Sequence, residues 1–193
     1  MGKVIFDISR SLDGFITGAN ARPEAGWAGL GEGGERLHDW EFNSADPRNR
    51  EIMESYATTG ANILGRTGYN HSIINWGADG PSGAARLPTV IVSHSVPQDI
   101  PDEGVYTFVD SVEAAFETAK KLAGDKDVVI LGANVAQQFL RRGLVDEISI
   151  HLVPVLFGSG TRFFEGLDGQ HIPLEIIEVI ETKEAIHMRF RVL

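Results

Sequence analysis

Hydrophobic residues along this chain fall into short continuous runs, separated by stretches in which they recur every three or four positions. The continuous runs are rich in Val and Ile, and Gly, Pro, Asn or Asp bounds each of them, as is typical of buried β-strands. We predict strands at residues 4–9, 61–64, 89–93, 105–109, 128–131, 147–153, 174–181 and 185–192.

Three of the intervening stretches carry residues that begin and end helices. Each opens with Asp or Asn, whose side chain accepts a hydrogen bond from a free N–H of the first turn, and each closes at a glycine. The predicted N-caps are Asp46, Asp110 and Asn134. The predicted stops are Gly60, Gly124 and Gly143.

The order of these elements indicates the class of fold. Strands alternate with helices over most of the chain, which favours a parallel sheet with helices packed on it. The last two strands are separated only by residues 182–184, so we expect them to form an antiparallel hairpin. We predict one α/β domain over residues 1–193, built on a mostly parallel eight-stranded sheet with an antiparallel C-terminal hairpin.

The composition excludes several classes of function. A formal net charge of -10 with scattered Lys and Arg disfavours nucleic-acid binding, which draws its affinity from clustered cations. There is no cysteine for thiol catalysis, and the six histidines lack the short spacing of metal ligands, so we predict no metal. No apolar run has the length of a signal peptide or a membrane span, so we expect a cytoplasmic protein without a membrane partner.

Glycines and polar residues follow three of the predicted strands where each reaches the end of the sheet. They are Gly65, Arg66 and Thr67, then Ser93 and His94, and finally Gly132, Ala133, Asn134 and Val135. Each junction alone is more typical of an ordinary turn than of a ligand site. Together, their backbone N–H groups and cations would gather at the carboxyl edge of one sheet and bind one elongated anionic ligand.

The segment SLDGFI places a carboxylate, Asp13, beside Gly14 directly after the first strand. Asp-Gly is a common turn signal, and this explanation is as good as a functional one. In the functional interpretation, Asp13 orients a polar heterocycle or a proton-delivering water. Trp40 is expected in the core or in the wall of a pocket, where it would be a candidate substrate contact.

Five motifs occur in a recognisable order: SLDGFI, GRTGYN, VIVSH, VVILGAN and LVDEISIHLVPVLFGSGTRFF. Together they resemble the dihydrofolate-reductase-like family that includes the C-terminal reductase domain of the bacterial riboflavin biosynthesis protein, and the resemblance covers nearly the whole chain. It implies a three-layer fold and NADPH bound across the carboxyl edge of the sheet. The zinc-binding deaminase half of the bifunctional enzyme has no counterpart in this sequence.

The resemblance also implies roles for individual residues. Gly65, Arg66 and Thr67 would lie at the cofactor phosphates, and Ser93 and His94 would approach the adenosine ribose and its 2'-phosphate. Gly132, Ala133, Asn134 and Val135 would cover the pyrophosphate and the nicotinamide side. Asp13, Gly14 and Ile16 would form the loop over nicotinamide and substrate, with Asp13 in the catalytic role and Arg162 a candidate for the substrate phosphate.

Two positions depart from the family pattern. Ala133 stands where the family commonly has a second glycine, and we expect its methyl group to raise the local strain. Residues 48–59 offer no inward carboxylate like the one that holds folate in dihydrofolate reductases. This second departure counts against folate reduction.

We therefore expect an NADPH-dependent reductase, with riboflavin-type pyrimidine reduction as the leading activity. The alternatives are a nucleotide- or pterin-binding module without turnover, and a reductase of a dihydropterin or of another carbonyl compound. A homodimer is also expected, because residues 147–157 are apolar enough that an exposed sheet edge there would associate.

Overall fold

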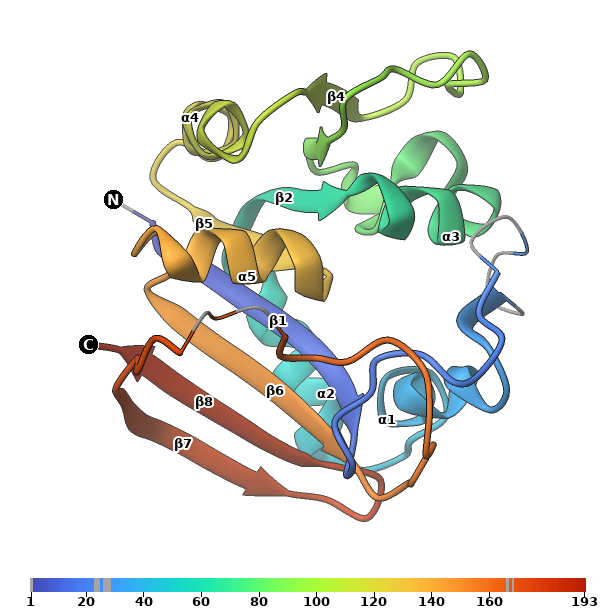
Figure 1. Cartoon of the computed structure of the whole chain (residues 1–193), viewed down its shortest axis with the longest axis vertical. Helices are drawn as coiled ribbons and strands as arrows, with labels where there is room; N and C mark the ends of the chain where they lie inside the picture. The colour runs from blue at the N-terminus through green and yellow to red at the C-terminus, as the bar shows by residue number, and fades with distance from the viewer. Residues whose placement is uncertain (1, 23–24, 26–28, 166, 168) are drawn as a thin grey trace.

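The computed structural model describes residues 2–22, 25, 29–165, 167 and 169–193. One eight-stranded sheet with the order β4-β3-β2-β5-β1-β6-β8-β7 runs through the molecule (Figure 1). Its strands are β1 (Val4–Ser11), β2 (Thr59–Gly65), β3 (Thr89–Val92), β4 (Tyr106–Val109), β5 (Asp127–Leu131), β6 (Glu147–Val153), β7 (Leu174–Glu181) and β8 (Ile186–Val192). Strands β1 to β6 pair in parallel, and β8 pairs antiparallel with both β6 and β7.

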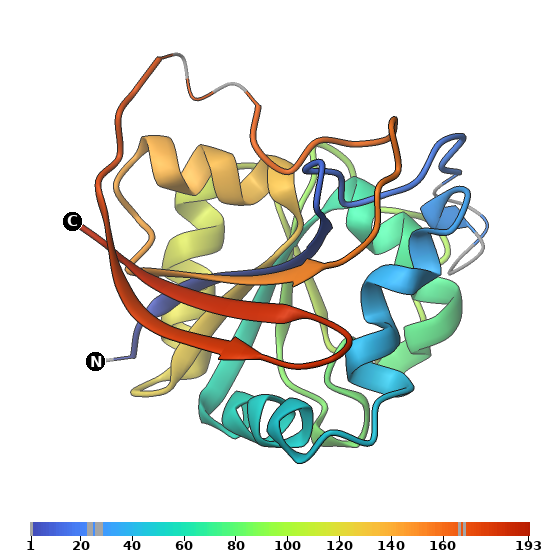
Figure 2. The same ribbon diagram turned by 90° about the horizontal axis from the view of Figure 1, so that it is seen from below.

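Helices cover both faces of the sheet (Figures 1 and 2). The α-helices are α1 (Asp39–Phe42), α2 (Pro47–Ser55), α3 (Arg66–Trp76), α4 (Val112–Ala123) and α5 (Ala133–Arg141). Short 3-10 helices occupy Gly34–His38, Tyr56–Thr58, Gly77–Asp79 and Gly83–Ala85. Helices α4 and α5 bury the larger hydrophobic cluster against one face, and α1, α2 and α3 pack on the other. The predicted mostly parallel sheet with its C-terminal hairpin is confirmed, within three layers.

All eight predicted strands are present, but two α-helices, the four-residue α1 and the longer α3, were not predicted. Helix α3 has a glycine and three β-branched residues within eleven positions and no side-chain N-cap, so it lacks the local signals of a helix. Two side chains of α3, those of Tyr69 and Ile73, pack on Leu64 and Ile91 of the sheet. Tertiary packing, rather than local propensity, therefore stabilises this helix.

The predicted helix boundaries need three corrections. Ser111, not Asp110, is the N-cap of α4, because its hydroxyl accepts a hydrogen bond from the backbone of the first turn. Gly132 precedes α5, so Asn134 lies inside the first turn instead of capping it. Helix α2 ends at Ser55, and Gly60 belongs to β2.

The expected exposed edge at residues 147–157 is also wrong. Strand β6 pairs with β1 on one side and with β8 on the other, so its backbone is fully used in the sheet. Among the described strands, β4 and β7 form the edges. Within the described residues, no helix has both the length and the apolar character that crossing a membrane requires.

Candidate functional site

The ends of three parallel strands lie side by side, as the sequence predicted. Leu64 pairs with Leu131 and Gly65 with Val92, so the residues that follow β2, β5 and β3 emerge next to one another. The order of the sheet puts β2 between the other two. The junctions that begin at Gly65, Ser93 and Gly132 therefore form one continuous rim at the carboxyl edge of the sheet.

Two helices begin at this rim with free backbone donors. Helices α3 and α5 have glycine at their N-cap positions and no side-chain cap, so their first N–H groups remain available. The two helix starts also lie close together. Gly65 precedes α3 and Val135 is in the first turn of α5, and a Cβ atom added to Gly65 would lie only 3.0 Å from Cγ2 of Val135. The positive ends of two helix dipoles thus converge on one place, which suits a ligand with several negative charges.

Gly132 is the residue whose backbone makes this approach. Its φ of 102° and ψ of 137° lie in a region that side-chain-bearing residues rarely adopt. Ala133 is the first residue of α5 and does not have a positive φ. The unusual backbone conformation therefore falls on Gly132, which as a glycine adopts it without strain, instead of on Ala133, whose methyl group is buried in the core.

Arg66 provides a fixed cation beside these donors. Its Nη1 donates to Oγ of Ser93 at 3.2 Å and to the carbonyl oxygen of Ser95 at 2.8 Å, and its Nε donates to Oδ1 of Asn70 at 2.9 Å. These bonds join the start of α3 to the end of β3. Thr67 and His94, which follow Arg66 and Ser93 in the chain, are exposed.

Asp13 is tied to a neighbouring loop. Its carboxylate accepts hydrogen bonds from the Ser11 hydroxyl at 2.6 Å and from the backbone N–H groups of Gly158 and Phe157 at 2.7 and 3.2 Å. The hydrogen bond from Ser11, followed by those from the two N–H groups, lowers the pKa of Asp13. The structure thus places Asp13 as a brace between residues 11–16 and 157–162, and its predicted catalytic role stays a prediction.

The same brace positions the other predicted residues of this loop. The N–H of Ile16 donates to the carbonyl oxygen of Thr161 at 2.8 Å, and Gly14 has a positive φ of 90°. The guanidinium carbon of Arg162 lies 4.9 Å from the centre of the Phe15 ring. Arg162 is exposed, so its charge faces the surface of the brace.

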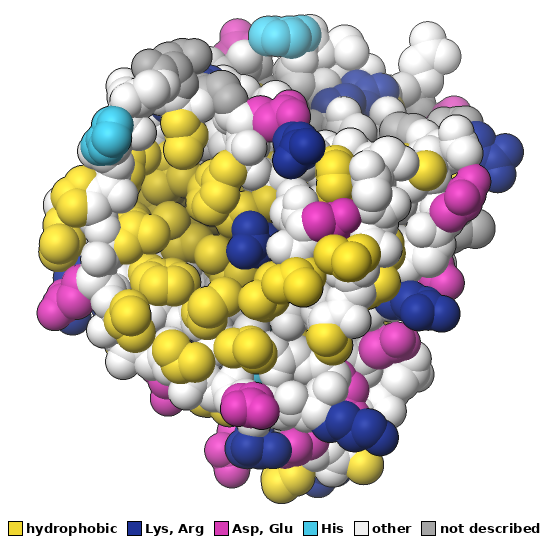
Figure 3. Space-filling view, turned by 60° about the horizontal axis from the view of Figure 1, so that its bottom comes forward, with side chains coloured by type: hydrophobic (Ala, Val, Ile, Leu, Met, Phe, Trp, Pro, Cys, Tyr) yellow, Lys and Arg dark blue, Asp and Glu magenta, His cyan; other side chains and the backbone are white. Residues whose placement is uncertain are grey.

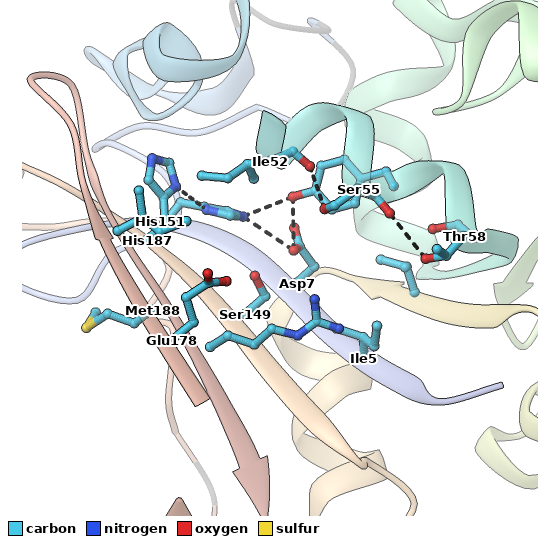
Figure 4. A pocket seen from close by; sticks show the side chains of 15 residues that line it. Ile5, Asp7, Ile52, Ser55, Thr58, Ser149, His151, Glu178, His187 and Met188 are labelled. Atoms are coloured by element: carbon cyan, nitrogen blue, oxygen red, sulfur yellow. Dashed lines mark hydrogen bonds and ion pairs between the residues drawn. The ribbon is translucent and has the colours of Figure 1, made fainter. Parts of the chain in front are cut away.

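A buried polar cluster between the sheet and α2 was not predicted (Figure 4). It consists of Asp7 on β1, Asn49 on α2, Tyr56 after α2, His151 on β6 and His187 on β8. The Tyr56 hydroxyl donates to Oδ2 of Asp7 at 3.0 Å, and Nε2 of His151 lies 3.3 Å from the same oxygen. Asp7, Tyr56 and both histidines line a cavity of about 60 Å³. A cavity of this volume has room for about four waters.

Trp40 packs on both histidines of the cluster and is a core residue. Its indole Nε1 donates to Oγ of Ser9 at 2.9 Å, and its ring centre lies 4.3 Å from that of His151. Only 3% of its surface is exposed. Of the two positions foreseen for Trp40, the structure selects the core, and direct contact with a substrate stays a prediction.

Burial and charge shift several pKa values in the cluster. Burial alone would raise the pKa of Asp7, but the charge of His151 and hydrogen bonds from His151, Ser149 and Tyr56 outweigh it and lower that pKa. Burial and the nearby Asp7 charge raise the pKa of Tyr56 well above its usual value. Burial and the charge of His151 lower the pKa of His187 to about 4. Asp7 is therefore ionised at neutral pH, while Tyr56 keeps its proton and His187 is neutral.

One pattern in the sequence could have revealed this cluster. Along β1 the polar residues Asp7, Ser9 and Ser11 recur at every second position and are all buried, although the strand lies inside the sheet. Polar residues at period two in a buried strand must share one face and find partners there. Their partners on α2, β6 and β8 are distant in sequence, so the pattern alone could not name them.

The rim is suited to binding phosphate groups. The N-termini of α3 and α5 and the guanidinium of Arg66 supply hydrogen-bond donors for phosphate groups. Gly65 leaves space for them, because it has no Cβ atom at a position where one would crowd Val135. Among the described residues, no group of three or more His, Cys, Asp or Glu side chains is placed to hold a metal ion.

Comparisons with known proteins agree with this architecture. Residues 2–188 match the family model described as the RibD C-terminal domain. The uncharacterized protein YwjB of Bacillus subtilis is 27% identical over 133 residues, which cover 68% of this chain and 74% of YwjB. A putative riboflavin biosynthesis protein from Shewanella sp. PV-4 superposes with a TM-score of 0.70 at 21% identity, covering 99% of both chains.

A dihydrofolate reductase from Enterococcus faecalis, solved with NADP(H) and RAB-propyl, has the same fold. Its TM-score is 0.61 at 14% identity, over 99% of this chain and 96% of that one. The expected dihydrofolate-reductase-like fold is thus confirmed. With the family model matched from residue 2 to residue 188, the chain belongs to the RibD C-terminal domain family.

Proposed function

We propose that this protein is an NADPH-dependent reductase that transfers hydride to a pyrimidine-like small molecule, most closely in the manner of riboflavin biosynthesis. One observation carries the proposal: two uncapped helix starts and the fixed guanidinium of Arg66 meet at the carboxyl edge of adjacent parallel strands. Membership of the RibD C-terminal domain family supports a reductase over other users of such a rim.

NADPH would be held by residues that the structure brings together. Backbone N–H groups at the starts of α3 and α5 would bind the phosphates, with Gly65 and Gly132 allowing close approach. Arg66, held by its hydrogen bond to Ser93, would pair with a phosphate, and the exposed Thr67 and His94 would add a hydroxyl and an imidazole at the same junctions. The bound cofactor supplies the hydride, and the protein aligns donor and acceptor and excludes water.

A phosphorylated substrate requires a cation of its own. Arg162 is exposed at the brace. The half-buried Arg10 also reaches the brace, because a Cβ atom added to Gly14 would lie 3.9 Å from Nη1 of Arg10. The Arg10 Nε is buried without a hydrogen-bond partner among the described residues, and burial lowers the pKa of this guanidinium. We propose Arg10, together with Arg162, as the groups that meet a substrate phosphate at the end of β1.

The decisive experiment measures binding and turnover separately. NADPH should raise the melting temperature of the protein, since a ligand that binds only the folded state stabilises it. Oxidation of NADPH should then follow when a ribosylamino-pyrimidine phosphate is added, with a dihydropterin and simple carbonyl compounds as comparison substrates. Binding without oxidation of NADPH across this panel would instead support the binding-module alternative, and absence of binding would end the proposal.

We also propose that the protein forms a homodimer through the sheet surface around β7. Leu174, Ile176 and Val179 pair with β8 residues that pack on the main core, so they extend that core onto the surface. Ile176 is 67% exposed and Val179 55%. Figure 3 shows a broad, hollowed hydrophobic area on this side of the molecule. An apolar edge strand with such a face needs a cover, and a second copy of the same surface provides a matching one.

A further inference from the structure

The brace between residues 11–16 and 157–162 stands beside the start of α5. Asp7 of β1 pairs with Leu131 of β5, and β1 continues beyond that point to Ser11. Because β1 and β5 are neighbours, the brace begins at the same edge of the sheet as the rim, next to the strand that leads into α5. Figures 1 and 2 show the segment that follows β6 passing beside α5.

Phe163 continues the brace into the core. Its backbone N–H donates to the carbonyl oxygen of Gly14 at 2.8 Å, which joins it to the loop after β1. Its ring is fully buried and stacks on the ring of Phe6, with ring centres 5.3 Å apart. Burial of the ring fixes where Phe163 lies, but apolar contacts are not directional. They leave the orientation of its backbone less well defined.

Gln137 of α5 supplies the directional contact. Its Nε2 donates to the carbonyl oxygen of Phe163 at 2.8 Å, in the interior of the protein. The other buried residues of α5 are apolar, namely Ala133, Val135, Ala136, Phe139 and Leu140. An amide on such a face costs free energy unless it is hydrogen-bonded, and a buried carbonyl without a donor costs free energy too. The side chain of Gln137 and the backbone of Phe163 therefore satisfy one another.

We infer that Gln137 is a positioning residue, which holds the brace in a fixed place relative to the start of α5. This inference rests on the reductase function proposed above, in which the cofactor phosphates bind at the start of α5 and the brace lies over nicotinamide and substrate. Gln137 is about one turn from that helix start. Hydride transfer needs donor and acceptor in close alignment, and the bond from Gln137 to Phe163 connects the parts of the protein that hold each of them.

The same bond links the stability of the two ends of the site. A ligand that binds only the intact site stabilises the contacts whose opening would disturb that site. NADPH at the rim should therefore slow the opening of the brace, although its phosphates bind at α5. The connection runs from α5 through Gln137 to Phe163 and on to Gly14.

Hydrogen exchange measures this connection in the wild-type protein. The N–H groups of Ile16 and Phe163 donate to Thr161 and Gly14, so their exchange rates report the opening of the brace. Saturating NADPH should slow both rates by about 10-fold or more. If the protein binds NADPH and neither rate changes, this inference fails and the proposed function stands. If the protein does not bind NADPH, the proposed function fails.

Gln137→Met tests the hydrogen bond itself. Met has a similar shape but no donor, so the carbonyl of Phe163 loses its partner. Exchange at Ile16 and Phe163 should become about 10-fold faster in the free protein, and NADPH should slow it less than in wild type. The kcat should fall by about 10- to 100-fold, while the Kd for NADPH stays as in wild type. Unchanged brace exchange and unchanged kcat would mean that Gln137 only fills the core.

Two control variants separate positioning from general stability. Gln138→Met changes the next residue, whose amide donates to Asn134 within the same helix, and should leave kcat and brace exchange as in wild type. Val112→Ala truncates a buried side chain of α4 and should lower the melting temperature without lowering kcat. An equal fall in kcat in Val112→Ala and Gln137→Met would reduce the effect of Gln137 to stability. If Gln137→Met does not fold, Gln137→Asn replaces it, because its amide is one methylene too short to reach Phe163.

Discussion

The Nδ1 atoms of His151 and His187 face each other at 2.7 Å in the interior of the protein, so one ring donates the proton and the other accepts it. This contact joins β6 to β8 within a cluster that spans five elements. A pair of this kind makes stability depend on pH, because charging the accepting ring removes the hydrogen bond.

The free energy of unfolding should fall as the pH drops from 6.5 to about 4. The pKa of His187 is lowered from 6.5 to about 4, so the unfolded state binds a proton in this window that the folded state refuses. The slope from this group is at most about 1.4 kcal/mol per pH unit. Urea unfolding at several pH values measures it; His187→Gln should reduce the slope and His171→Gln should not. An unchanged slope in His187→Gln would contradict the shift.

Gly132→Ala should lower the free energy of unfolding by about 1–3 kcal/mol, because only glycine adopts its φ of 102° without strain. Ala133→Gly is the matched control. Since Ala133 is helical, that change should also destabilise, by up to about 1 kcal/mol, instead of relieving strain. Chemical denaturation measures both. A gain in stability for Ala133→Gly would locate the strain at Ala133 after all.

Arg66→Gln should weaken NADPH binding by about 10-fold or more, as expected for the loss of a charge-assisted hydrogen bond to a phosphate. Isothermal titration calorimetry measures the affinity. Arg50→Gln, on the exposed face of α2, removes the same charge at a distance and should leave binding intact. Equal losses in the two variants would mean that only net charge matters and that Arg66 does not contact the cofactor.

Asp13→Asn should lower the melting temperature, because an amide cannot accept from Ser11 and from both backbone N–H groups in the same way as a carboxylate. The lowered pKa of Asp13 means that its contribution is present above the usual carboxyl range and is lost as the pH falls through the folded value. Asp99→Asn, at an exposed position, is the control. A variant that melts like wild type but loses its rate would assign Asp13 to the chemistry instead of the brace.

Ile176→Glu should convert a dimer into a monomer, because it places a charge at the centre of the exposed apolar face of β7. Light scattering coupled to gel filtration measures the molecular mass. Glu175→Gln, in the same strand but paired with Arg191 on the opposite face, should remain dimeric. A monomeric wild-type protein would remove the basis of the proposal.

The rim was predicted largely because its signals are local. Gly65 and Gly132 follow continuous apolar runs, and residues that end adjacent parallel strands must emerge at the same edge. The buried cluster escaped prediction because each of its members is unremarkable in its own segment. Asn49 is one of several polar residues on α2, and only the structure shows that it alone of that helix is fully buried.

The sequence by itself determined the eight strands, two of the junctions that begin helices, and the family to which the chain belongs, since apolar runs and glycines act over a few residues. The tertiary structure decided what those signals left open. It stabilised α3 by packing, placed β6 inside the sheet and β7 at its edge, and turned Asp13 onto the backbone of a distant loop. It also brought His151 and His187 together, because a contact between residues so far apart in sequence exists only once strand order and register are fixed.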